Sequence, residues 1–194
     1  SVSRIHPRVI PDSQAIFQMN YSNWMNDPSP EPAILIGKQY VVKCDISTCF
    51  PSIYTHSLPW AIMGRDRAKQ DREERPDNWA NKIDKLLQKV SDGETHGLLI
   101  GPHSSNVVSE LILTVIDANL YNKGYRFIRN IDDYSCYVAS QQEGEGFILS
   151  LQEELSKFRL TLNQKKTEVL ELPMALSQSW VNSLRRNEPI KSDP

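Results

Sequence analysis

Two adjacent aspartates, Asp132 and Asp133, stand between two short apolar segments, and this pattern constrains the fold more than any other feature of the sequence. The flanks, residues 125–128 and 134–139, are rich in β-branched and aromatic residues, which favour strands. The pattern therefore predicts a tight hairpin with two carboxylates at its tip. Neighbouring carboxylates repel unless a cation neutralises them, and Mg²⁺ prefers such oxygen ligands. The alternative is an ordinary solvated Asp-Asp turn, so a third carboxylate is needed to decide.

Asp45 is the candidate third carboxylate. It ends a nearly continuous apolar run over residues 40–46, which predicts a strand covered on both faces. If this strand neighbours the hairpin in one sheet, Asp45, Asp132 and Asp133 converge at one edge. Converged carboxylates can hold two Mg²⁺ ions about 3.5–4 Å apart, an arrangement suited to in-line phosphoryl transfer.

The rest of the chain indicates an α+β fold, a small antiparallel sheet with helices packed on one face. The mixed charges of residues 65–78 predict a solvated loop, with a nucleic-acid contact as the weaker alternative. Pro51 suits the start of a short helix after Phe50, and Ser104 or Ser105 can cap the long helix. Helical spacing or strand composition marks further elements: helices over 13–19, 79–90, 106–122, 144–158 and 180–184, and strands over 160–162 and 168–172.

Composition limits the class of protein. The chain has 194 residues and a net charge of −2, which argues mildly against a self-sufficient nucleic-acid clamp. The three cysteines, Cys44, Cys49 and Cys136, show no metal-finger spacing. No signal peptide and no apolar run of membrane length is visible, so we expect a cytoplasmic protein that is not in a membrane.

Four segments, in order, resemble the palm motifs of reverse transcriptases, which are RNA-directed DNA polymerases. They read Tyr-Val-Val-Lys-Cys-Asp-Ile-Ser-Thr-Cys-Phe at 40–50, Leu-Ile-Gly-Pro-His-Ser-Ser-Asn at 99–106, Asn-Ile-Asp-Asp at 130–133, and Leu-Asn-Gln-Lys-Lys-Thr at 162–167. The set covers about residues 40–172. The surrounding wording looks most like the bacterial abortive-infection branch, which defends against phage.

The resemblance implies a role for each matching residue. Asp45, Asp132 and Asp133, with the carbonyl of Ile46, are the implied ligands of two Mg²⁺ ions, for which Mn²⁺ can substitute. Phe50 stands at the position of a steric gate against the ribose 2′-hydroxyl, and Lys166 would lie near the leaving phosphates. Three further positions match substrate-binding segments: Gly101, Ser104 and Asn130. The resemblance to a polymerase also makes four basic residues candidates for phosphate contacts: Arg126, Arg129, Lys165 and Lys166.

The sequence also departs from the family pattern. Asn130 replaces the usual aromatic residue, and Ile100 replaces the common glutamine before Gly101.

The resemblance also implies a domain organisation. We expect partial fingers in the irregular segment 1–39, a palm over 40–172 with a charged helical insertion at about 65–95, and a C-terminal segment 173–194 leading toward a thumb that is missing. We expect a piece of a longer protein, inactive by itself.

The sequence therefore predicts a reverse-transcriptase-like enzyme that transfers deoxynucleotides from their triphosphates to a primer hydroxyl. The copying of an RNA or DNA template, untemplated extension and protein priming all stay open, as does an oligomeric state. One alternative is another palm-type enzyme, such as a nucleotide cyclase. A second alternative is a non-catalytic nucleic-acid-binding or scaffold domain with degenerate motifs.

Overall fold

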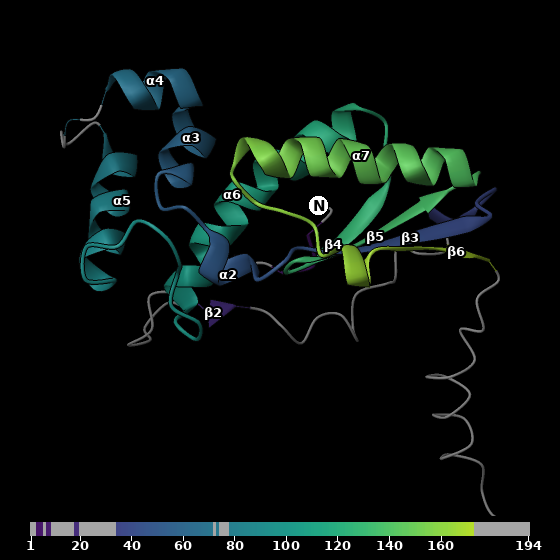
Figure 1. Cartoon of the computed structure of the whole chain (residues 1–194), viewed down its shortest axis with the longest axis horizontal. Helices are drawn as coiled ribbons and strands as arrows, with labels where there is room; N and C mark the ends of the chain where they lie inside the picture. The colour runs from purple at the N-terminus through teal and green to yellow at the C-terminus, as the bar shows by residue number, and fades with distance from the viewer. Residues whose placement is uncertain are drawn as a thin grey trace, which may run out of the picture.

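The computed structural model describes residues 3–5, 7–8, 18–19, 34–71, 73 and 78–172. These residues form a two-stranded antiparallel sheet, a four-stranded sheet and a set of helices (Figure 1). The elements are β1 (Pro7–Arg8), β2 (Gln18–Met19), β3 (Tyr40–Asp45), α2 (Cys49–Ser52), α3 (Ser57–Met63), α4 (Arg65–Gln70), α5 (Trp79–Val90), α6 (His103–Asn122), β4 (Phe127–Asn130), β5 (Asp133–Val138), α7 (Gln141–Lys157), the 3-10 helix η2 (Gln164–Lys166) and β6 (Glu168–Glu171).

The larger sheet confirms the predicted α+β architecture. Its strand order is β4-β5-β3-β6, and every neighbouring pair is antiparallel. Helices α6 and α7 lie together over one face of this sheet, while α3, α4 and α5 extend beyond its end (Figure 1). In the register of β3 and β5, Asp45 stands directly opposite Asp133. The predicted first strand and hairpin are therefore neighbours, as the convergence of their carboxylates requires.

Alternation along β3 separates the hydrophobic core from the polar face of the sheet. Val42 and Cys44 point to the face covered by helices, whereas Lys43 and Asp45 occupy the opposite face because side chains alternate along a strand. Lys43 is exposed, so the expectation that this strand is covered on both faces holds only in part. The aspartate face is thus the face that α6 and α7 leave uncovered.

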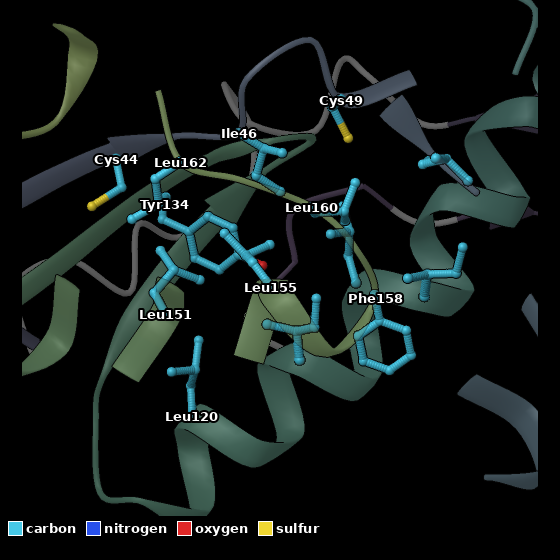
Figure 2. Packing of buried hydrophobic residues seen from close by; sticks show 14 of the residues in the cluster. Cys44, Ile46, Cys49, Leu120, Tyr134, Leu151, Leu155, Phe158, Leu160 and Leu162 are labelled. Atoms are coloured by element: carbon cyan, nitrogen blue, oxygen red, sulfur yellow. The ribbon is translucent and has the colours of Figure 1, made fainter. Parts of the chain in front are cut away.

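The core fills the space between the sheet and the two long helices. Figure 2 shows Tyr134 of β5 among side chains from α6 and α7, including Leu120 and Leu151. Ile46 and Leu162 lie in the same cluster and are joined by a backbone bridge. Fully burying a Leu or Ile side chain contributes about 1.5–3 kcal/mol, so this cluster is the main force that holds the sheet against the helices.

Local sequence explains where α7 begins. The Ser140 hydroxyl accepts a hydrogen bond from the Glu143 backbone N–H at 3.2 Å, and the Glu143 carboxylate accepts one from the Ala139 backbone N–H at 2.8 Å. This arrangement is a close variant of the capping box. The helix predicted over 144–158 buries its regularly spaced apolar residues Phe147, Leu151, Leu155 and Phe158. Glu154 is also buried, and it is held by Asn119, Lys123 and Lys157.

Gly144 brings α7 close to the sheet, and its replacement by alanine is expected to destabilise the fold. A Cβ atom there would lie 3.0 Å from a Val42 methyl and 3.4 Å from a Val169 methyl. Overpacking costs about 1–3 kcal/mol, while removing a helical glycine returns about 1 kcal/mol, so Gly144→Ala should lower the free energy of unfolding by about 1 kcal/mol in urea titrations. Gly146→Ala is the matched control, because its Cβ would meet only the Tyr125 hydroxyl, at 3.3 Å. Equal effects of the two substitutions would contradict this account of the packing.

Two predictions of local structure, one of a loop and one of a strand, are wrong. The segment 65–78 was expected to be a loop, but its first six residues form α4, since arginine, lysine, alanine and glutamine are strong helix formers even on a surface. The strand predicted over 160–162 is reduced to one bridge between Ile46 and Leu162. Arg159, at a φ of 63°, turns the chain immediately before this segment and shortens the pairing.

Helix α5 has the predicted bounds, but its apolar side is buried only in part. Trp79, Leu86 and Val90 are exposed, whereas Ile83 and Leu87 pack against the core, and the polar residues Asn81 and Asp84 are buried as well. These buried polar groups are satisfied: Asn81 donates to the Asp71 carbonyl at 2.6 Å, and Asp84 hydrogen-bonds to His56 and accepts from Gln88 of the same helix at 2.9 Å. Hydrogen bonds to neighbouring segments therefore override the apolar periodicity here.

Helix α6 begins earlier than predicted. Pro102, with a φ of −61°, is its N-cap residue, so neither Ser104 nor Ser105 caps it. Leu111 of this helix is exposed, although its apolar side chain and its spacing predict that it is buried. The helix predicted over 13–19 lies mostly outside the described residues, although its last two residues form β2, and the helix over 180–184 lies wholly outside them. Among the described residues, no helix is both long and apolar enough to cross a membrane.

Candidate metal and nucleotide site

Three carboxylates meet at one end of the sheet, as the sequence predicted. Asp45 is the last residue of β3, Asp133 is the first of β5, and Asp132 belongs to the turn between β4 and β5. Each offers a carboxylate oxygen, and these atoms all lie within 4.8 Å of one another. The Ile46 backbone N–H donates to the Asp132 carbonyl at 3.3 Å, which ties the turn to the end of β3.

The segment that contains η2 contacts Asp45 from the other side. Asn163 donates its backbone N–H to the Asp45 carbonyl at 2.8 Å and its side-chain amide to Asp45 Oδ2 at 3.0 Å. Lys166 Nζ lies 3.2 Å from the same carboxylate oxygen, although the lysine side chain is largely exposed. The third motif (130–133) and the fourth motif (162–167) therefore both contact the first motif (40–50) at the end of β3.

The turn of the hairpin is strained. Ile131 adopts a φ of 58°, a region that β-branched residues rarely enter. Arg129, fully buried, donates from Nη1 to the Ile131 carbonyl at 2.7 Å and so holds the turn in this conformation. Such strain persists only where the surrounding structure enforces it. The geometry of Asp132 therefore depends on a side chain from the strand before it.

Arg129 is itself held by two carboxylates of α6. Its guanidinium donates to Glu110 at 2.7 and 2.9 Å, and to Asp117 at distances from 2.8 to 3.1 Å. The Tyr134 hydroxyl donates to Asp117 at 3.1 Å, which completes a buried network beneath the turn. The expectation that Arg129 contacts phosphate is therefore wrong, because the carboxylates and the turn use its donors inside the protein.

Burial and neighbouring negative charge shape the electrostatics of the site. Burial, followed by the nearby negative charge of Asp45, raises the pKa of Asp132. Burial and the charges of Asp132 and Asp45 also raise the pKa of Asp133. Like charges directly opposite each other in a sheet are destabilising, so the protein has accepted an unfavourable arrangement at this position. A bound cation would relieve it.

These raised pKa values predict that divalent-ion binding weakens at higher pH than it would at an ordinary aspartate site. Asp132 and Asp133 take up protons first as the pH falls, and a protonated carboxyl group is a poorer ligand. We expect the affinity for Mn²⁺, measured by calorimetric titration from about pH 7 to about pH 4, to begin to fall above the ordinary aspartate pKa of about 3.9. Asp132→Asn should bind more weakly and show a shallower pH dependence. Constant affinity across this range would contradict the assignment.

The other predicted site residues surround the carboxylates at varying depth. Phe50 lies in α2, half-buried against the core, and Asn130 ends β4 opposite Asp133 with its side chain exposed. Gly101 has a φ of 115°, and a Cβ there would meet no atom within 4 Å. This open glycine leaves room for a ligand to approach the backbone. Ser104 is exposed in the first turn of α6, and the Ile46 side chain is buried.

Sequence reasoning missed two features of the site. The sequence shows Asn163 only as one residue of the fourth motif, and the preference of asparagine for turns is the signal that points to its place before η2. The Glu110 and Asp117 pair was hidden in a helix read for its apolar residues alone. A charged residue repeated seven positions apart on a buried helix was the available signal.

Sheet topology and carboxylate cluster together define a palm-like fold of the polymerase type. No protein-family model matches the sequence, and no curated protein matches it. Among solved structures, the chain is similar to apo telomerase from Candida tropicalis truncated from its C-terminal domain, with 12% identity, a TM-score of 0.53 and 78% of this chain aligned. The likeness at this identity concerns the fold.

Two further telomerase structures are similar at lower scores. Apo telomerase from Candida tropicalis gives a TM-score of 0.49 at 14% identity over 69% of this chain. Telomerase from Candida albicans in complex with a TWJ fragment of telomeric RNA gives 0.48 at 11% identity over 71% of this chain. In the order given, the aligned regions cover 34%, 29% and 27% of the three telomerase chains, so this chain spans about a third of their length or less.

Proposed function

We propose that the chain is the catalytic palm of a reverse-transcriptase-like DNA polymerase, which transfers deoxynucleotides from their triphosphates to a primer hydroxyl. The observation that carries this proposal is the meeting of Asp45, Asp132 and Asp133 within 4.8 Å on a palm-like sheet. The four ordered motifs of the sequence support it, because three of them contribute contacts around Asp45. The bacterial phage-defence branch belongs to the proposal through the residues around the motifs alone, and a cytoplasmic location through the lack of a visible signal peptide or membrane-length apolar run in the sequence.

The residues fit Mg²⁺. Hard carboxylate oxygens are its preferred ligands, and three of them meet here. Burial, together with the neighbouring negative charges, raises the pKa of Asp132 and of Asp133. Asp45, Asp132 and Asp133 would hold the ions, with the Ile46 carbonyl as a further candidate ligand. When bound, two Mg²⁺ ions would supply Lewis-acid stabilisation of the attacking hydroxyl and of the departing pyrophosphate.

Lys166 would contribute its own charge to the same reaction. In the absence of substrate its Nζ neutralises Asp45 across 3.2 Å, while most of the side chain faces solvent. A long exposed lysine can change partners at little cost, so it would turn from Asp45 to the phosphates of an incoming triphosphate. Asn163 would keep Asp45 in place during this exchange, because its two hydrogen bonds do not involve the lysine.

Product analysis tests the proposal. The chain, and a longer form of the protein that supplies any parts it needs, would be incubated with Mg²⁺, labelled deoxynucleoside triphosphates and an RNA or DNA primer–template. Extension of the primer is the expected result. Reactions without template or without primer separate templated copying from untemplated or protein-primed synthesis. A cyclic nucleotide product would indicate a cyclase, and failure to bind a divalent ion at all would indicate a scaffold domain.

Phe50→Ala should relax the choice of sugar. If the Phe50 ring meets the ribose 2′-hydroxyl, its loss should increase incorporation of ribonucleotides relative to deoxynucleotides by about tenfold to a hundredfold. Competition between the two triphosphates in the extension assay measures this ratio. Phe50→Tyr keeps the bulk of the ring and should preserve the discrimination. An unchanged ratio in folded Phe50→Ala would leave Phe50 as a core residue only.

A further inference from the structure

A second cleft lies among the helices that extend beyond the sheet. It is bounded by α3, α4 and α5 and by the residues after α7, and its volume is about 410 Å³. None of Asp45, Asp132 or Asp133 lines it. Its lining includes the aromatic residues Tyr54 and Trp60 and the basic residues Arg65, Lys69, Lys85 and Arg159.

The charge of this cleft is strongly positive, in contrast to the whole chain, whose net charge is −2. Arg65 and Lys69 come from α4, Lys85 from α5, and Arg159 from the turn after α7. The only carboxylate lining the described cleft is Asp84, and it is already hydrogen-bonded to His56 and Gln88. Cations gathered from three separate segments indicate a binding surface for an anion.

Aromatic rings orient the two arginines. The Arg65 guanidinium lies over the Trp60 ring, 4.8 Å from its centroid. The Arg159 guanidinium lies over the Tyr54 ring at 4.3 Å and near Trp60 at 5.7 Å. A guanidinium stacked on a ring keeps its N–H groups directed outward in a fixed plane, which suits bidentate contact with a phosphate. Neither guanidinium has a carboxylate partner among the described residues.

We propose that this cleft binds the phosphodiester backbone of a single-stranded nucleic acid. Its volume admits about one nucleotide. Exposed arginine and lysine side chains beside aromatic rings are the combination that single-strand grooves use. Arg65 and Lys69 belong to the segment 65–78, for which the sequence alone favours a solvated loop over a nucleic-acid contact. The proposal does not depend on the carboxylates, and the test therefore excludes divalent ions.

Fluorescence anisotropy of a labelled oligo(dT) of about 20 nucleotides tests this site, with the full chain in EDTA and KCl from about 50 to about 200 mM. Arg65→Ala/Arg159→Ala should weaken binding at least about tenfold, because two charge-assisted contacts are lost. The slope of log affinity against log salt should become shallower by about 1.4, or 0.7 for each phosphate contact. Thermal melting would verify that the variant is folded.

Arg67→Ala/Lys82→Ala is the matched control. It removes the same charge from two exposed basic residues that do not line the cleft, one on α4 and one on α5. This control should keep both the affinity and the salt slope. Equal losses in the two variants would overturn the proposal in favour of general surface charge. Absence of binding by the unmodified chain, or displacement of the oligonucleotide by an equal concentration of inorganic phosphate or thymidine monophosphate, would overturn it as well.

The test also separates this proposal from the proposed polymerase activity. Asp132→Asn should bind the oligonucleotide in EDTA as tightly as the unmodified chain, since its carboxylate does not line the cleft. Loss of primer extension with oligonucleotide binding intact would leave the cleft assignment standing. Loss of binding in Arg65→Ala/Arg159→Ala with metal binding intact would support the cleft independently of catalysis.

Discussion

Asp132→Asn is expected to lower primer extension about a thousandfold or more in the form of the protein that shows activity. The substitution preserves size and hydrogen bonding but removes a charge from the carboxylate cluster. Metal-ion stabilisation of a phosphoryl-transfer transition state amounts to several kcal/mol, and each 1.36 kcal/mol is a factor of about ten in rate. Steady-state incorporation of a labelled deoxynucleotide measures the loss.

Asp92→Asn is the control for this substitution. Asp92 is exposed at a φ of 53°, a conformation that asparagine also tolerates, and it is remote from the cluster in the chain. Its activity should equal that of the unmodified protein. Asp132→Asn should also be slightly more stable in the absence of metal, because one of the repelling charges is gone. Unchanged extension by Asp132→Asn would refute the proposed catalytic role.

Arg129→Met is expected to destabilise the fold by about 3–5 kcal/mol, the usual cost of removing one partner from a buried ion pair. Arg129 is fully buried, and its loss would leave Asp117 and Glu110 without their cation. Burial already raises the pKa of Asp117. The Ile131 carbonyl would also lose its donor at the strained turn. Urea unfolding monitored by circular dichroism measures the change.

Arg126→Met is the matched control, because Arg126 is an exposed arginine three residues earlier and stacks on the surface ring of Tyr121. Its effect should stay within about 0.5 kcal/mol. A second variant, Arg129→Met/Asp117→Leu, should recover part of the lost stability, since the cost comes from an unpaired buried charge. If Arg129→Met were as stable as the unmodified chain, the network beneath the turn would contribute nothing to folding.

Much of the site was predictable because its signals are local. The strand that ends at Asp45 and the hairpin around Asp132 follow from composition and turn position within a few residues, and the sheet places them side by side. The Lys166 contact with Asp45 depends on a longer-range approach. Only the resemblance to palm motifs led us to place that lysine near the reaction.

Other features could not be predicted from local pattern, because they depend on tertiary partners. The sequence around Arg129 is typical of a surface cation, yet carboxylates about two and about four turns into the preceding helix bind it in the interior. Helix α5 was recognised by apolar spacing, but the hydrogen bonds of Asn81 and Asp84 decide which side it buries. The cleft that contains Arg65 and Arg159 joins segments far apart in the chain.

The central claim is that Asp45, Asp132 and Asp133 form the metal site of a nucleotidyl-transfer enzyme. Crystals of the chain soaked with Mn²⁺ and a deoxynucleoside triphosphate test it most directly, because Mn²⁺ accepts the same oxygen ligands and its anomalous scattering is visible. We predict one or two anomalous peaks between these carboxylates and the triphosphate, with the sugar against Phe50. Ordered and accessible carboxylates without a peak, at Mn²⁺ concentrations that saturate polymerase sites, would contradict the claim.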